Sequence, residues 1–197
     1  MRMKRVLTFS AILFIATTMA LLAGARGQQA PPAAPAVPGL TLTSTAFDDG
    51  SIIPPKYTQA DPNPVSPKLQ WTNVPPNVVS FTLILHDADV AVEKKTEDIL
   101  HWMAFNIPGT ARELPEGVPS ANAQLADGTI QAKNRRGTVG YMGPGMGPQG
   151  PYHHYTFDLY ALDTKLSLGP DASRADVLVA MNGHIVAKAV LVGRFHR

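Results

Sequence analysis

The sequence predicts a mainly β domain, folded as an antiparallel sandwich with few short helices. Two stretches, 80–87 and 101–107, are nearly continuous in apolar, strand-forming residues, which is typical of buried strands. A third stretch, 155–162, alternates between two faces, as a strand in a sheet does. One segment, 173–183, carries the signals of a helix, and much of the remainder is proline-rich loop.

The strands follow one another along the chain. A weak alternation in LTLTSTAF (40–47) predicts the first, and SFTLILHD (80–87) predicts the second. HWMAFNI (101–107) predicts the third, which Pro108 and Gly109 end. In YTFDLYAL (155–162), Tyr155 shares a face with Phe157, so this strand is expected to have one buried face. HIVAKAVLVGRF (184–195) predicts the last strand.

The helix prediction comes from its two ends. Ser173 and Asp176 have the spacing of a capping box, with aspartate in the place of glutamate. Gly183 lies where a glycine commonly ends a helix. Between them lie the apolar residues Ala175, Leu178, Val179 and Met181.

Residues 1–39 precede the predicted domain. A short basic stretch, an apolar run from Val6 to Ala23 and then small residues predict a secretory signal peptide over residues 1–27. An uncleaved anchor is the alternative, because the apolar run is near the lower limit for spanning a bilayer. Residues 28–39 predict a Pro/Ala-rich tether. We therefore expect a domain at residues 40–197, a periplasmic or secreted protein, and no transmembrane span after cleavage.

Composition narrows the classes of partner. The whole chain has 17 basic and 15 acidic residues, a net charge of +2. Cleavage after Gly27 removes four basic residues and no acid, which leaves a net charge of −2, so no nucleic-acid partner is expected. The chain has no cysteine. Disulfides and a lipidated cysteine are thereby excluded, and stability must come from the core.

Polar residues gather at the predicted strand ends. Asp87 and Asp89 end the second strand, and His101 opens the third, on the same face as Met103. On the next strand His153 shares a face with Tyr155, whereas His154 points to the other face. The loop before it, residues 134–155, contains six glycines and three prolines, a composition that favours a shaped binding loop.

Five blocks of sequence, taken in order, resemble the phosphatidylethanolamine-binding protein family, specifically its bacterial Raf-kinase-inhibitor-like branch. They are NPVSPKLQWTNVPPNVVSFTLILHDAD, HWMAFNIPGTARELPEG, GTVGYMGPGMGPQG, HHYTFDLYALD and GHIVAKAVLVGRF. The resemblance covers nearly all of residues 40–197. It implies a large antiparallel sheet packed on a smaller one, with few helices.

The resemblance also implies a small anion pocket near one edge. Carried over residue by residue, the implied ligand-binding residues are Asp87, His101, Gly143, Pro144, Gly145, His153 and Tyr155, with Asp89 in support. Three departures from the family pattern put the identity of the ligand in doubt. Both prolines of its Asp-Pro-Asp-Ala-Pro motif are absent at 87–91, consecutive prolines are replaced by Met146 and Gly147, and His154 replaces an arginine.

The chemistry of these residues suits a phosphoryl group. Two imidazoles and a phenol can donate hydrogen bonds, and backbone N–H groups in a glycine loop can bind an anion. We expect a binding module for phosphate-bearing small molecules or phospholipid head groups, with a protein partner docked at the same pocket as a further option. The alternative is a metal-dependent or phosphoester hydrolase using the same His/Asp cluster. No nucleophile motif or helical metal spacing is present, so we assign no catalytic residue, no metal ligand and no cofactor.

Overall fold

The computed structural model describes residues 38–145, 147 and 150–196. The predicted signal peptide and nearly all of the predicted tether lie outside these residues. Within the described ranges, no helix combines the length and hydropathy needed to cross a bilayer.

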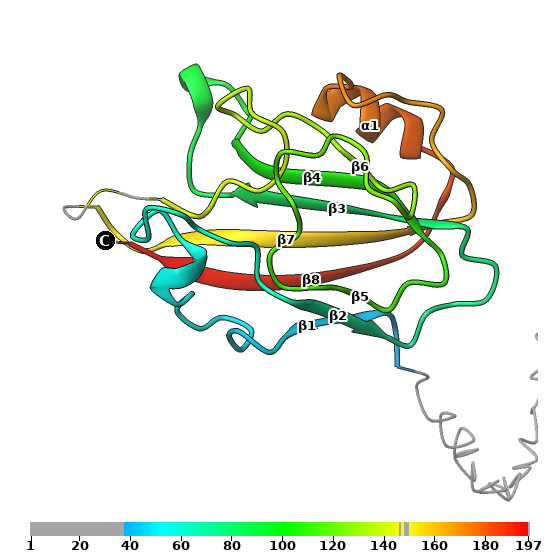
Figure 1. The fold of residues 1–197 in the computed structure, drawn as a ribbon, viewed down its shortest axis with the longest axis horizontal. Coiled ribbons are helices and arrows are strands. Elements are labelled where there is room, and N and C mark those ends of the chain that lie inside the picture. The colour runs from blue at the N-terminus through cyan, green and yellow to red at the C-terminus, as the bar shows by residue number, and fades with distance from the viewer. Residues whose placement is uncertain (1–37, 146, 148–149, 197) are drawn as a thin grey trace, which may run out of the picture. The chain divides into compact units, whose positions relative to one another are not determined.

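Two antiparallel sheets make up the domain, as predicted (Figure 1). The five-stranded sheet has the order β6-β4-β3-β7-β8, and the three-stranded sheet has the order β1-β2-β5. The strands are β1 (Thr41–Ser44), β2 (Leu69–Thr72), β3 (Ser80–Asp87), β4 (Ile99–Pro108), β5 (Glu113–Leu114), β6 (Ile130–Gln131), β7 (His153–Leu162) and β8 (Ile185–Phe195).

The main core lies between the two sheets. On β3 and β7 every second residue enters it, which is the period-two pattern of a strand with one face on the core. The buried members of these two rows are Phe81, Leu83 and Leu85 on β3 and Tyr155, Phe157, Leu159 and Ala161 on β7. The smaller sheet contributes Leu42, Leu69, Trp71 and Leu114.

A second apolar cluster covers the outer face of the large sheet. There, α1 (Arg174–Met181) packs Val177 and Met181 against Ile84 and Met103. The predicted capping box is present, since Ser173 Oγ accepts from the Asp176 N–H and Asp176 Oδ2 accepts from the Ser173 N–H. Gly183 follows with a φ of 82°, a left-handed conformation that favours glycine.

The long strands match the predicted ranges to within two residues, apart from the first, which is shorter than expected. Three strands were not predicted: β2, β5 and β6, of four, two and two residues. Segments this short carry too few residues for a pattern to show. Two single-turn 3-10 helices, Pro55–Tyr57 and Val92–Lys94, were also unexpected.

Candidate functional site

The inner rows of β3 and β7 end in polar residues at the same edge of the sheet. Asp87 continues the row of Phe81, Leu83 and Leu85, and its Cα pairs with that of Tyr155 across the two strands. His153 precedes Tyr155 on the same face of β7 and is buried, whereas His154 is exposed. The core therefore passes directly into a covered cluster of ionisable side chains.

The side chain of His101 also lies in this cluster, on the face of β4 opposite to the one that strand alternation predicts. We expected His101 on the face of Met103 and Phe105, but these two residues pack in the outer cluster. The pairing of β3 with β4 shifts between Leu85↔Trp102 and His86↔Leu100, so His101 is the extra residue of a β-bulge. The bulge turns its ring inward, where it meets the Tyr155 ring edge-on at a centroid distance of 5.2 Å.

A hydrogen bond joins the ends of the two central strands. His153 Nδ1 lies 2.8 Å from Asp87 Oδ2, with both side chains almost fully buried. The other carboxylate oxygen of Asp87 accepts from the backbone N–H of Asp89 at 3.1 Å. Both oxygens of Asp87 are thus occupied, and the histidine ring is held in one orientation.

Asp89 holds the turn that follows β3. Its Oδ2 accepts from the backbone N–H of His154 at 2.6 Å and lies 2.9 Å from the ring nitrogen Nδ1 of the same residue. Burial alone would raise the pKa of Asp89, but these hydrogen bonds outweigh it and lower the pKa below its ordinary value. Asp89 thus gives His154 a structural partner, and its support of a ligand site stays a prediction.

The glycine loop meets His101 through its carbonyl oxygens. His101 Nδ1 lies 3.0 Å from the carbonyl oxygen of Met142 and 3.2 Å from that of Gly143. Because both neighbours are acceptors, Nδ1 carries a hydrogen. The other ring nitrogen, Nε2, is buried and has no hydrogen-bond partner among the described residues.

Gln59 fixes the same loop and was not anticipated. Its backbone N–H donates to the carbonyl of Pro144 and its side-chain amide donates to that of Gly143, both at 2.8 Å. A β-carbon added at Gly145 would lie 2.3 Å from the Gln59 side chain, so glycine is needed for this close approach. At Gly145 the group that approaches closely is the Gln59 side chain of the chain itself, and contact of this loop with a ligand stays a prediction. Gln59 is 84 residues from Gly143 in a loop without a motif, so no local signal could have revealed it.

The Tyr155 hydroxyl, like His101 Nε2, is one of eight buried side-chain polar atoms without a hydrogen-bond partner among the described residues. Burial raises the pKa of this phenol, and the negative charge of Asp87 raises it further, while the backbone N–H of Gly145 acts in the opposite sense. The phenol therefore keeps its proton at physiological pH and can donate a hydrogen bond.

Asp87, Asp89 and His153 also offer three ligand atoms within 4.8 Å of one another, close enough to surround a cation. The same atoms of Asp87 and His153 are bonded to each other, and Asp89 is bonded to His154. A metal would have to replace those hydrogen bonds.

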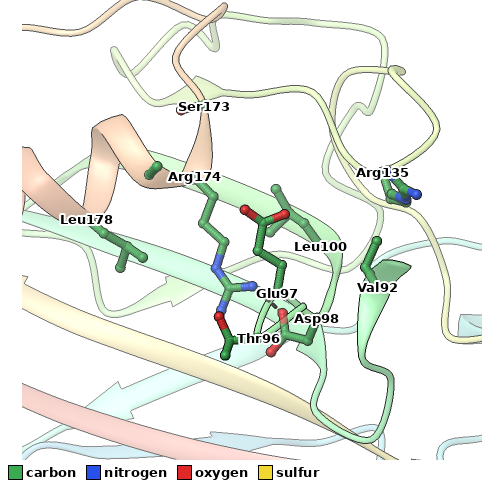
Figure 2. Close-up of a pocket in the computed structure, with 10 residues that line it drawn as sticks. Val92, Thr96, Glu97, Asp98, Leu100, Arg135, Ser173, Arg174 and Leu178 are labelled. Carbon is green, nitrogen blue, oxygen red and sulfur yellow. Dashed lines mark hydrogen bonds and ion pairs between the residues drawn. The ribbon is translucent and has the colours of Figure 1, made fainter. Parts of the chain in front are cut away.

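A cavity of about 540 Å³ lies elsewhere, between α1 and the segment that precedes β4, and none of the candidate residues lines it (Figure 2). Arg174 points into it and pairs with Asp98, which also lies 2.5 Å from His86 Nδ1. Asp98 thus belongs to a partly buried ion-pair network on the outer face of the sheet.

Comparison with known proteins identifies the family that has this sequence pattern and fold. The family model described as phosphatidylethanolamine-binding protein matches residues 43–196. The chain belongs to the phosphatidylethanolamine-binding protein family. A UPF0098 protein from Methanothermobacter thermautotrophicus is 44% identical over 158 residues, which is 80% of this chain and 99% of the relative. One from Aquifex aeolicus is 40% identical over 160 residues, 80% of this chain and 89% of the relative.

Solved structures of the family have the same fold. A phosphatidylethanolamine-binding protein homologue from Chlamydia trachomatis superposes with a TM-score of 0.70 at 34% identity, covering 81% of this chain and 98% of the other. Escherichia coli YbcL, described as a member of the mammalian family, superposes with a TM-score of 0.71 at 26% identity, covering 81% of this chain and 99% of the other. The predicted family and fold are confirmed.

The His101 site predicts a titration that can be measured. Burial lowers the pKa of His101 below its ordinary value of 6.5, against opposing effects of the Met142 and Gly143 carbonyls and of Asp87. The unfolded chain therefore takes up this proton first, and the stability that neutral His101 contributes is full above about pH 6.5. This contribution to stability is lost as the pH falls from about 6.5 through the pKa of His101 in the folded protein. The ring proton resonances of His101 in NMR should titrate with a midpoint below 6.5, and a midpoint above that value would contradict the described environment.

Proposed function

We propose that this protein is a binding module that holds a small phosphoryl anion between His101, His153 and Tyr155. The observation that carries the proposal is that two of the buried polar atoms without partners in the described part of the chain, Nε2 of His101 and the Tyr155 hydroxyl oxygen, lie on residues whose rings are in contact. Buried polar groups in proteins are nearly always hydrogen-bonded, so an unpaired pair beside an ordered Asp–His unit is typical of a binding site.

The charges around these atoms suit an anion that brings its own hydrogen-bonding groups. Asp87 is occupied by His153 and Asp89, so its negative charge is partly compensated. The Arg136 guanidinium donates to Gln59 Oε1 at 2.6 Å, and its positive charge acts on His101. Phosphate-bearing small molecules and free phospholipid head groups both carry the phosphomonoester group that fits this arrangement.

Binding without turnover is the reading favoured by the side chains near the site. Tyr155 is the hydroxyl-bearing residue at its centre, and its raised pKa makes the phenol a poor nucleophile. The hydrolase alternative is supported by Asp87, Asp89 and His153, whose ligand atoms lie close enough together to surround a cation. Release of phosphate from a generic phosphoester on adding zinc, abolished in His153→Ala, would favour that alternative.

The proposed location rests on the predicted leader, and the proposed partners rest on the candidate site. The leader predicted at residues 1–27 supports a periplasmic or secreted protein, and N-terminal sequencing of the secreted chain should then reveal Gln28 first. A protein that presents a phosphorylated side chain is a further candidate partner for the same site.

Two adjacent histidines provide a matched test of the site. His153→Gln removes a buried imidazole that faces Tyr155, whereas His154→Gln changes an exposed ring on the opposite face. Phosphate binding followed by amide shifts in NMR should weaken by about tenfold or more in His153→Gln, since hydrogen bonds to charged groups are worth about 1.5–3 kcal/mol. His154→Gln should bind within about twofold of the wild type. Equal weakening by both substitutions would refute a specific role for His153.

Tyr155→Phe separates a binding role from a structural one. The substitution removes a hydroxyl that has no partner among the described residues, so it should leave the free energy of unfolding unchanged or raise it. Phosphate affinity should fall by roughly fivefold to tenfold, the value of one ordinary hydrogen bond. Urea denaturation and the NMR titration measure the two quantities. Loss of stability with unchanged affinity would show that the hydroxyl is structural.

A further inference from the structure

We propose that Nε2 of His101 accepts a hydrogen bond from a protonated phosphoryl oxygen, so that the site selects phosphomonoesters over phosphodiesters and sulfate esters. This inference rests on the proposed function and names the chemical class of its ligand.

The tautomer of His101 is the first step. Its Nδ1 faces two carbonyl oxygens, those of Met142 and Gly143, at 3.0 and 3.2 Å. A carbonyl oxygen can only accept, so the hydrogen of a neutral imidazole resides on Nδ1. Nε2 then presents a lone pair, and it is an acceptor, not a donor, toward whatever enters the site.

The surroundings of His101 decide whether a second proton joins the ring. Burial opposes it, the positive charge of Arg136 opposes it, and Asp87 together with the two carbonyl oxygens favours it, with a net lowering of the pKa. The other titratable groups facing the ring from β7 are Tyr155, which stays neutral, and His153, which is bonded to Asp87. Near neutral pH, His101 in the free protein is therefore an acceptor.

The ligand must supply the missing donor. A phosphomonoester has its second pKa near 6, so its monoanion carries one P–OH group together with oxygens that accept. That monoanion can donate to Nε2 while accepting from the Tyr155 hydroxyl. A phosphodiester or a sulfate ester of the same charge has acceptors alone, and it would set an oxygen lone pair against the nitrogen lone pair of Nε2.

Access to the site requires a small movement. Both Nε2 and the Tyr155 hydroxyl are shielded from water in this structure. The backbone N–H of Gly145 acts on the pKa of that hydroxyl, which places the glycine loop beside it. A ligand therefore reaches the two atoms by displacing the Gly143–Gly145 segment outward, and a ligand that leaves Nε2 unpaired gains too little to hold the loop there.

Methyl phosphate and methyl sulfate make a matched pair for the test. At about pH 6 the methyl phosphate monoanion and methyl sulfate have the same charge and nearly the same shape, and they differ in one O–H group. We expect the protein to bind the methyl phosphate monoanion about tenfold more tightly or better in calorimetry, because an unpaired buried acceptor is costly. Dimethyl phosphate should behave like methyl sulfate.

The pH dependence and one variant complete the test. When the pH is lowered from 6 to 4.5, the ratio of the affinity for methyl phosphate to that for methyl sulfate should decrease, because His101 takes up its own proton and becomes a donor. In His101→Gln the side-chain amide offers either a donor or an acceptor, so the ratio of the affinities for methyl phosphate and methyl sulfate should approach 1. If this variant does not fold, the wild-type pH series alone tests the proposal. Equal affinity for the three probes from pH 4.5 to 6 would overturn the selection of a protonated ligand and leave the proposed function standing. No binding of any probe would overturn the proposed function itself.

Discussion

The hydrogen bond between His153 and Asp87 ties together the two central strands where the apolar core gives way to ionisable side chains. Both residues lie on the inner face, in rows that otherwise hold Phe, Leu, Tyr and Ala. A carboxylate this deeply buried needs partners for both oxygens, and His153 and the Asp89 N–H provide them. Beside these satisfied groups, Nε2 of His101 and the hydroxyl of Tyr155 are two of the eight buried polar atoms that lack a hydrogen-bond partner among the described residues.

The bulge at His101 makes this arrangement possible. A regular β4 would send His101 to the outer face beside Met103, away from Tyr155. One extra residue between Leu100 and Trp102 brings the ring inside without disturbing the apolar rows on either side. Bulges commonly re-aim side chains beside functional sites, and here the bulge also brings Nδ1 to the carbonyl oxygens of the glycine loop.

The long strands and α1 could be predicted because each carries a repeated local signal. Alternation along β7 also separated His153 from His154 correctly, since a regular strand leaves no choice of face. The inward turn of His101 could not be predicted in this way, because a bulge breaks the rule on which the prediction depends. Gln59 and the pairing of Asp98 with His86 were missed for another reason: tertiary contacts between segments without motifs leave no trace in a single sequence.

In the proposed site, His101 is neutral in the free protein and its Nε2 needs a hydrogen-bond donor, so the tautomer set by two carbonyl oxygens determines the chemistry of the ligand. The most direct test is a crystal structure of the protein grown with phosphate. We expect phosphate oxygens within hydrogen-bonding distance of His101 Nε2 and the Tyr155 hydroxyl, with the glycine loop moved outward. Phosphate bound instead in the outer cavity between Arg135 and Arg174, with the inner site unchanged, would contradict it.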